Sequence, residues 1–320
     1  MQYNDLSIIF QGPIISDKFN NYTVLALNSA LKHFPGSEII FSTWKESVVP
    51  NEILENKLIK VLYNIDPGSG VRKDRPITYH NVNRIIVSSI QGIQFATRKY
   101  CIKTRSDMIF DSSSSIRYFS RYNKVIDSYS FFKDKIIVSN QTSINPSYGP
   151  KLLYHICDWF FLGRREDLLK LYDIKLIDDK IQVRWYETHP KPENQIDKNN
   201  LSLFMAEDYV ISEFFKKKFK IKHDFYCDYD KEQEQISEML IVNNFVIVDN
   251  NKLGIHSGKF QSLSQAYLWK CYTYQEWKNI YSKNILGKKL YFTFHERIAL
   301  LLLNLNPIHI FRIIKHKYLN

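Results

Sequence analysis

The spacing of apolar runs in the early part of the chain constrains the fold more than any other feature. Residues 6–10, 38–44 and 58–63 are apolar runs of strand length, each followed by polar, glycine or proline residues. Residues 22–33 and 81–96 carry apolar side chains at helical spacing. Strands that alternate with helices pair in parallel, because each helix returns the chain to the same end of the sheet. We therefore predict an α/β fold with a mostly parallel central sheet.

The stretch over residues 100–111 predicts the central strand of that sheet. It begins apolar, turns polar at residues 103–107 and becomes apolar again. This pattern is typical of a buried strand whose carboxyl end presents charge to a ligand. There the Asp107 carboxylate can hold a divalent cation, and the Arg105 guanidinium can pair with phosphate. The alternative is an ordinary Arg–Asp surface pair where a strand leaves the sheet.

The ends of the other predicted strands, and the start of the helix over residues 81–96, supply candidates for the same crevice. We expect these residues to bind a nucleotide-activated donor: Gln11, Gly12, Pro13, Thr43, Trp44, Asp66, Asn83 and Arg84. The alternative is that the strand-end residues only form turns and core. No glycine-rich phosphate loop of the Walker or dinucleotide type occurs in the sequence, which argues against an NTPase or a dehydrogenase.

Three carboxylates are candidates for acid–base chemistry or sugar recognition. Glu207 and Asp208 begin a predicted helix, where a carboxylate can deprotonate an acceptor hydroxyl. The alternative is that both only complement the helix dipole. Asp158 and Trp159 lie in an aromatic run over residues 154–163 that we predict to be a strand, so the ring can stack on a sugar and the carboxylate can accept its hydroxyl groups. The alternative is a buried aspartate bonded to neighbouring amides.

A late segment bracketed by glycines, residues 253–259, predicts a loop near the same crevice. His256 can complete the coordination of a metal ion, and Lys259 can meet a diphosphate, since Gly258 lets the backbone approach closely. The alternative is a loop histidine beside a solvated lysine.

The net charge of +11 favours an anionic partner. No zinc-ligand spacing, RNA-binding aromatic motif or clear helix-turn-helix is present, so we do not expect nucleic acid. Much of the basic excess lies late in the chain, and we predict a basic amphipathic helical extension over residues 286–320 that contacts an anionic membrane surface. The four cysteines are widely spaced and no secretion signal is visible. We expect a cytoplasmic protein, peripheral on the inner face of the membrane.

Several motifs together resemble the WavE lipopolysaccharide synthesis family. Between about Leu6 and Asp208 they read SIIFQGP, FSTW, NIDPG, NVNR, ATRKY, KTRSD, CDWFFLG and AEDYV. The resemblance implies a bacterial glycosyltransferase with a GT-A-like nucleotide-sugar-binding domain, which we place at residues 1–285. In GT-A enzymes an acidic motif after a central strand binds a divalent metal and the donor diphosphate. Here that motif reads Arg105-Ser106-Asp107, with arginine in place of the first acid.

The resulting prediction is transfer of a sugar from a nucleotide-activated donor to a hydroxyl of a lipopolysaccharide, capsule or related glycan intermediate, with inversion at the anomeric carbon. The predicted roles are Mn²⁺ or Mg²⁺ binding by Asp107 and His256, phosphate neutralisation by Arg84, Arg105 and Lys259, and base catalysis by Asp208, or else by Glu207 or Asp158. The alternatives are a sugar nucleotidyltransferase and, suggested by the charge alone, a non-catalytic nucleic-acid-binding protein.

Overall fold

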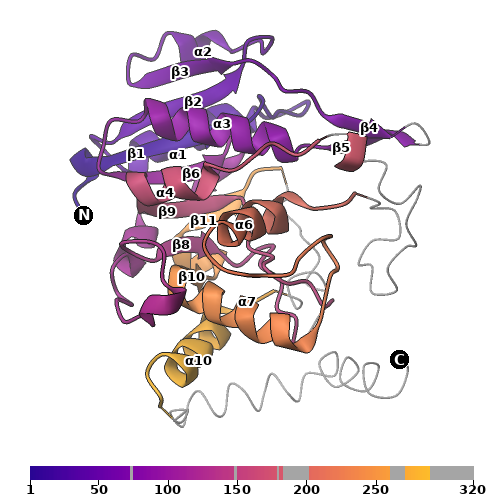
Figure 1. Ribbon diagram of the computed structural model, residues 1–320. Helices are drawn as coiled ribbons and strands as arrows, with labels where there is room; N and C mark the ends of the chain where they lie inside the picture. The colour runs from indigo at the N-terminus through magenta and orange to yellow at the C-terminus, as the bar shows by residue number, and fades with distance from the viewer. Residues whose placement is uncertain (73–74, 148–149, 179, 183–201, 260–270, 289–320) are drawn as a thin grey trace, which may run out of the picture.

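A seven-stranded mixed sheet forms the centre of the protein in the computed structural model (Figure 1). The structure describes residues 1–320 except 73–74, 148–149, 179, 183–201, 260–270 and 289–320. The strands follow the order β10 (Phe245–Val248), β8 (Ile136–Ser139), β9 (Phe160–Arg164), β6 (Tyr100–Arg105), β1 (Leu6–Gln11), β2 (Glu38–Trp44) and β3 (Ile59–Asn64). The predicted α/β class is confirmed.

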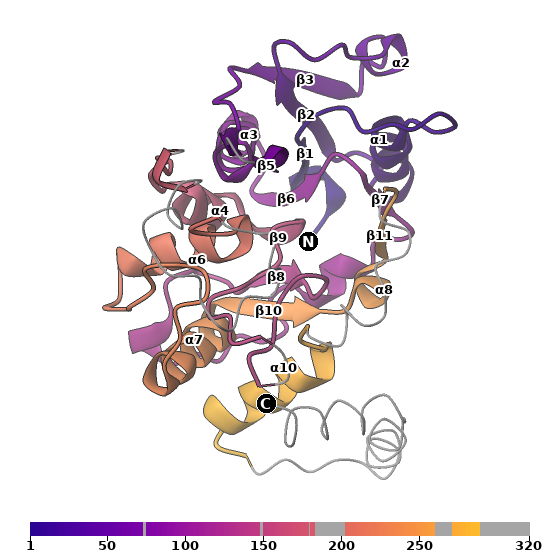
Figure 2. The ribbon, with the colours of Figure 1, turned by 90° about the vertical axis from the view of Figure 1, so that its right-hand side faces the viewer.

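One half of the sheet is parallel. β1 lies between β2 and β6, and these three strands and β3 all run in the same direction. Every residue of β1 and β2 is buried, because α3 (Val82–Phe95) and α1 (Tyr22–His33) lie on opposite sides of the sheet (Figure 2). The predicted parallel strands and the two helices between them are therefore confirmed. The carboxyl ends of the four strands meet at one edge, where ligands bind in open α/β sheets.

β9 interrupts this pattern, because it runs antiparallel to both β6 and β8. The prediction of a strand over residues 154–163 is wrong for its first part, since β9 begins only at Phe160. Tyr154 has a φ of 56°, which breaks the extended conformation. The antiparallel direction places the start of β9 beside the carboxyl end of β6, and the Arg105 N–H donates to the Trp159 carbonyl at 3.1 Å. Asp158 and Trp159 thereby reach the same edge as the ends of the parallel strands.

Shorter elements surround the sheet. β7 (Met108–Phe110) pairs antiparallel with β11 (Ile255–Ser257), so the prediction of a loop over residues 253–259 is wrong at its centre. The remaining elements are β4 (Gly70–Arg72), β5 (Arg75–His80), α2 (Asn51–Leu54), α4 (Arg165–Tyr172), α6 (Ala206–Lys216), α7 (Lys231–Asn244), α8 (Asn250–Leu253), α10 (Tyr274–Asn284), and the 3-10 turns η1 (Tyr3–Asp5), η2 (Ser114–Tyr118) and η3 (Asp127–Tyr129). α7 and α10 were not predicted from the sequence, and they pack against β10 and each other.

The carboxyl-terminal extension predicted over residues 286–320 falls almost entirely outside the described residues. α10 ends at Asn284, and the described chain ends at Lys288. The domain boundary at residue 285 and the membrane contact of the extension therefore stay predictions. In the part of the chain that the structure describes, no helix is both long and apolar enough to cross a membrane.

Gly92 determines how closely α3 packs on the sheet. A Cβ atom at this position would lie 2.4 Å from Ile9 Cγ2 and 3.2 Å from Ser42 Cβ. Gly92→Ala is therefore expected to push α3 away from β1 and β2 and to lower the free energy of unfolding by about 1–3 kcal/mol, the usual effect of overpacking. Urea denaturation measures the change, with Gln91→Ala at an exposed position of the same helix as the control. An unchanged midpoint for Gly92→Ala would mean that α3 can shift freely.

Candidate active site

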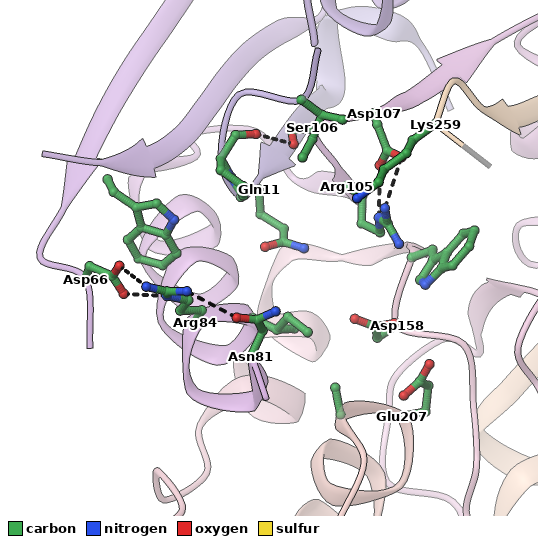
Figure 3. Close-up of a pocket in the computed structure, with 17 residues that line it drawn as sticks. Gln11, Asp66, Asn81, Arg84, Arg105, Ser106, Asp107, Asp158, Glu207 and Lys259 are labelled. Atoms are coloured by element: carbon green, nitrogen blue, oxygen red, sulfur yellow. Dashed lines mark hydrogen bonds and ion pairs between the residues drawn. The ribbon is translucent and has the colours of Figure 1, made fainter. Parts of the chain in front are cut away.

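A pocket of about 570 Å³ opens at the carboxyl-terminal edge of the parallel strands (Figure 3). The ends of β1, β2 and β6, the first turns of α3 and α6, and the segment before β9 all contribute to its wall. The predicted site residues that line it are Gln11, Gly12, Pro13, Trp44, Asp66, Arg84, Arg105, Asp107, Asp158, Glu207 and Lys259. The topology thus brings most of the candidates from the sequence into one cavity.

The ends of β1 and β2 form a fixed wall of this pocket. Gly12 has a φ of 115°, a conformation that favours glycine, and its N–H donates to the Ser42 carbonyl at 3.0 Å. The Ser88 hydroxyl of α3 donates to Gln11 Oε1 at 2.7 Å and orients the amide. Trp44 is buried, with 6% of its surface exposed, yet it also lines the pocket. The wall is therefore rigid, partly aromatic and equipped with an oriented amide.

Asp66 and Arg84 form an ion pair on another side of the pocket (Figure 3). Arg84 Nε donates to Asp66 Oδ1 at 2.7 Å, and Nη2 donates to Asp66 Oδ2 at 2.6 Å. The hydrogen bonds from Arg84 lower the pKa of Asp66 below its usual value. Arg84 also donates to Asn81 Oδ1 at 3.3 Å, which ties the pair to the start of α3. The negative charge of Asp66 offsets the positive charge of Arg84, and both side chains are partly exposed to the cavity.

Arg105 is held on two sides at the end of β6. Its Nε and Nη2 donate to the two oxygens of Asp107, at 2.9 Å and 3.0 Å. The Trp159 ring lies against the guanidinium, with its centroid 4.2 Å from Cζ. Asp107 Oδ2 also accepts from the Ser257 hydroxyl at 2.9 Å. The Arg105 side chain is 21% exposed, whereas that of Asp107 is 1% exposed, so the cation faces the pocket and the carboxylate lies behind it.

The donor set predicted for a divalent cation is not assembled. Both Asp107 oxygens already accept hydrogen bonds from Arg105. His256 lies on β11 opposite Ile109, and its Nδ1 pairs with Asp111 Oδ2 at 3.0 Å on an exposed surface. Asp111 and His256 do not line the pocket. Across the described ranges, no group of three or more His, Cys, Asp or Glu side chains is placed to hold a metal ion. These residues therefore do not fit a Mn²⁺ or Mg²⁺ site at Asp107.

Glu207, in the first turn of α6, and Asp158, in the segment before β9, both line the pocket (Figure 3). Burial of Glu207 and the charge of Asp158 raise the pKa of Glu207 to about 8. Lys103 is fully buried and donates to the Asp158 carbonyl. It also contacts the rings of Phe161 and Tyr172, each centred 5.5 Å from Nζ. Burial lowers the pKa of Lys103 to about 8. The pocket therefore combines a carboxyl group of raised pKa, Glu207, with a buried lysine of lowered pKa behind the Asp158 carbonyl.

Besides His256, three of the predicted site residues lie outside the pocket lining. Asp208 is fully buried, and its carboxylate accepts from the Met205 N–H at 2.7 Å and contacts His223 Nε2 at 2.9 Å. Thr43 is also buried, and its hydroxyl donates to Ser47 Oγ at 3.0 Å. The Asn83 amide exchanges hydrogen bonds of 2.9 Å with the backbone of Ile177. The observed partners of all three side chains are internal, so the structure does not bring them to the cavity.

Several lining residues were not among our candidates. The Ser106 hydroxyl donates to the Pro13 carbonyl at 2.6 Å. The sequence alone did not indicate a role for Ser106, because the charged neighbours Arg105 and Asp107 are the more obvious candidates. The other additions are Ile15, Asn81, Ile85 and Ala206. Asn81 precedes α3, so its place at a helix start was a usable signal. The aliphatic residues carry no chemical signal in the sequence.

Comparisons with known proteins identify one family. A model of the family described as WavE lipopolysaccharide synthesis matches residues 6–314. No curated protein matches the chain. Among solved structures the chain is similar to the 4-diphosphocytidyl-2C-methyl-D-erythritol synthase of Anaerococcus prevotii DSM 20548, with 11% identity and a TM-score of 0.33 over 74% of this chain and 97% of that one.

Proposed function

Because the chain belongs to the WavE lipopolysaccharide synthesis family, we propose that it is a glycosyltransferase. It would transfer a sugar from a nucleotide-activated donor to a hydroxyl of a bacterial surface-glycan intermediate. The observation that carries the proposal is the pocket itself, in which basic side chains, an aromatic wall and a carboxyl group of raised pKa face one cavity. Its place beyond the carboxyl ends of parallel strands is where nucleotides bind in open α/β sheets.

The donor would lie along the wall formed by the parallel strands. We assign the diphosphate to Arg105 and Lys259, which come from the β6 end and the segment after β11. The base and ribose would contact Trp44, Gln11 and the pair of Asp66 and Arg84. The reason for this division is charge: Asp66 already neutralises Arg84 through two hydrogen bonds, so the pair is better suited to polar ribose and base groups than to phosphate.

The transfer step follows from the position of the two carboxyl groups. Glu207 accepts the proton of the acceptor hydroxyl as its oxygen bonds to the anomeric carbon. The bond from that carbon to the phosphate oxygen breaks, and its electron pair leaves with the nucleotide. Arg105 and Lys259 stabilise the charge that develops on the leaving phosphate. Attack on the face opposite the leaving group inverts the anomeric carbon. Burial and the charge of Asp158 raise the pKa of Glu207 to about 8, which makes its carboxylate a stronger base than an ordinary one.

A thermal-shift screen followed by product analysis tests this function. The full-length protein is mixed with UDP-, GDP-, CMP- and dTDP-sugars, and one of them is expected to raise the melting temperature. That donor, incubated with lipopolysaccharide or capsule intermediates, should release a nucleoside diphosphate, or CMP from a CMP-sugar. Release of pyrophosphate from a nucleoside triphosphate and a sugar 1-phosphate would instead identify a nucleotidyltransferase. No shift with any donor, no transfer and no pyrophosphate release would refute both activities.

A further inference from the structure

We propose that the pocket binds the donor's diphosphate without a divalent cation, and that the Arg105 guanidinium stands where the metal would otherwise be. The inference depends on the proposed function, because it concerns how the same pocket neutralises the leaving group. It rests on four contacts of described residues. Asp107 is contacted by Arg105, by Ser257 and by Gly258, and the Arg105 guanidinium lies against the Trp159 ring.

Asp107 is a poor ligand for a cation in this arrangement. Its carboxylate is almost fully buried, Oδ1 accepts from Arg105 Nε, and Oδ2 accepts from both Arg105 Nη2 and the Ser257 hydroxyl. A divalent cation would have to displace these donors. It would then stand beside a guanidinium that does not lose its proton in proteins, and two like charges in contact repel strongly. The carboxylate therefore orients Arg105 instead of binding metal.

The Arg105 guanidinium is preorganised to bind an anion before the donor binds. Asp107 fixes one edge of the guanidinium, and the Trp159 ring fixes its plane. A planar guanidinium that is already held loses little side-chain entropy when it binds phosphate. Hydrogen bonds from a cation to phosphate are also among the stronger ones in proteins. These features make Arg105 a fixed positive charge at the pocket wall.

The β7–β11 ribbon brings a second cation to the same wall. The Gly258 N–H donates to the Asp107 carbonyl at 2.8 Å, which ties the segment after β11 to the end of β6. A Cβ at Gly258 would lie 2.5 Å from Tyr22 Cδ1, so the close approach requires glycine. The next residue, Lys259, is exposed and lines the pocket. Arg105 and Lys259 together supply the two positive charges that a diphosphate needs.

Isothermal titration calorimetry of the full-length protein tests the inference. UDP, GDP, CDP and dTDP are titrated in buffer with EDTA and in buffer with manganese chloride. The nucleotide that binds is expected to do so in both buffers, with dissociation constants within about fivefold of each other. A stronger dependence on manganese would overturn the inference and leave the proposed function standing. If no nucleotide bound in either buffer, the proposed function would fall as well.

Variants of Arg105 sharpen the test. Arg105→Ala is expected to weaken binding in EDTA by about 10- to 100-fold, the loss of charge-assisted hydrogen bonds to phosphate. Arg105→Lys keeps a positively charged partner for Asp107, so this variant remains informative if the alanine variant does not fold. Its loss of nucleotide affinity should be smaller than that of Arg105→Ala. Arg105→Asp should make binding depend on manganese. The control is Arg117→Ala, since Arg117 also lies against a ring, 5.1 Å from the centroid of Tyr118, outside this pocket. Unchanged binding by Arg105→Ala would contradict the inference.

Discussion

Glu207→Gln is expected to lower the turnover number of sugar transfer by about 100- to 10,000-fold, the usual contribution of a general base. The affinity for the donor should change little, because a base acts in the transition state and not in ground-state binding. The amide keeps the size of the side chain at the start of α6 but cannot accept the acceptor's proton. Steady-state kinetics with the donor identified by the thermal-shift screen measures the change.

The matched control for this experiment is Glu213→Gln. Glu213 lies on the same helix, and its carboxylate forms a partly exposed pair with Lys216 at 2.8 Å. Loss of the Glu213 charge should leave the turnover number unchanged. If Glu207→Gln kept wild-type turnover while Asp158→Asn lost it, the base would be Asp158. A collapse of donor affinity without loss of turnover would place Glu207 among the donor contacts instead.

The raised pKa of Glu207 gives two pH-dependent expectations. The wild-type kcat/KM should rise with pH until Glu207 is deprotonated, near its pKa of about 8, and this rise should vanish in Glu207→Gln.

The second expectation concerns stability. The folded protein keeps the Glu207 proton between the ordinary carboxyl pKa of 4.5 and about 8, whereas the unfolded chain releases it. The contribution of Glu207 to stability therefore falls as pH rises through that window. Above it, Glu207→Gln should melt at a higher temperature than wild type.

Asp208→Ala is expected to act on folding instead, although the two acidic residues are adjacent. The variant removes the acceptor for the Met205 N–H at the start of α6, a cap worth about 0.5–2 kcal/mol. It also removes the partner of a buried His223 nitrogen, which adds about 1–3 kcal/mol. We therefore expect the free energy of unfolding to fall by roughly 2–4 kcal/mol, measured by urea denaturation.

Two comparisons interpret the Asp208 result. Glu213→Ala removes a partly exposed carboxylate from the same helix and should change the free energy of unfolding by less than about 1 kcal/mol. Asp208→Asn keeps an oxygen for the Met205 N–H, so a smaller loss is expected than with alanine. A stable Asp208→Ala protein that had lost all turnover would instead restore Asp208 as the base, the role that its sequence position first indicated.

The parallel half of the sheet was predictable because each of its strands is an apolar run that ends in polar or glycine residues. Once the strands are parallel, their carboxyl ends meet, and residues far apart in sequence share an edge. Gln11, Trp44, Asp66 and Arg105 reached one pocket for that reason alone. No knowledge of side-chain contacts was required.

The roles of neighbouring residues were less accessible from the sequence. Glu207 and Asp208 both start α6, and the rotation of the helix decides which carboxylate faces the pocket. Asp208 turns inward to the buried His223, a partner that the sequence pattern does not connect to it. His256 and Ser257 differ similarly, because alternation along β11 turns Ser257 towards Asp107 and His256 outward. α7 was missed because its buried residues gather in its second half.

The antiparallel position of β9 has a consequence for synthesis on the ribosome. β6 ends at Arg105, and one of its edges can pair with β1 as soon as it emerges. Its other edge pairs with β9, whose residues run from Phe160 to Arg164 and are translated much later. Until then a nascent chain displays the unpaired amides and carbonyls of the β6 edge, a template for association with other chains. Truncated products that end before β9 should therefore aggregate or require a chaperone at that edge.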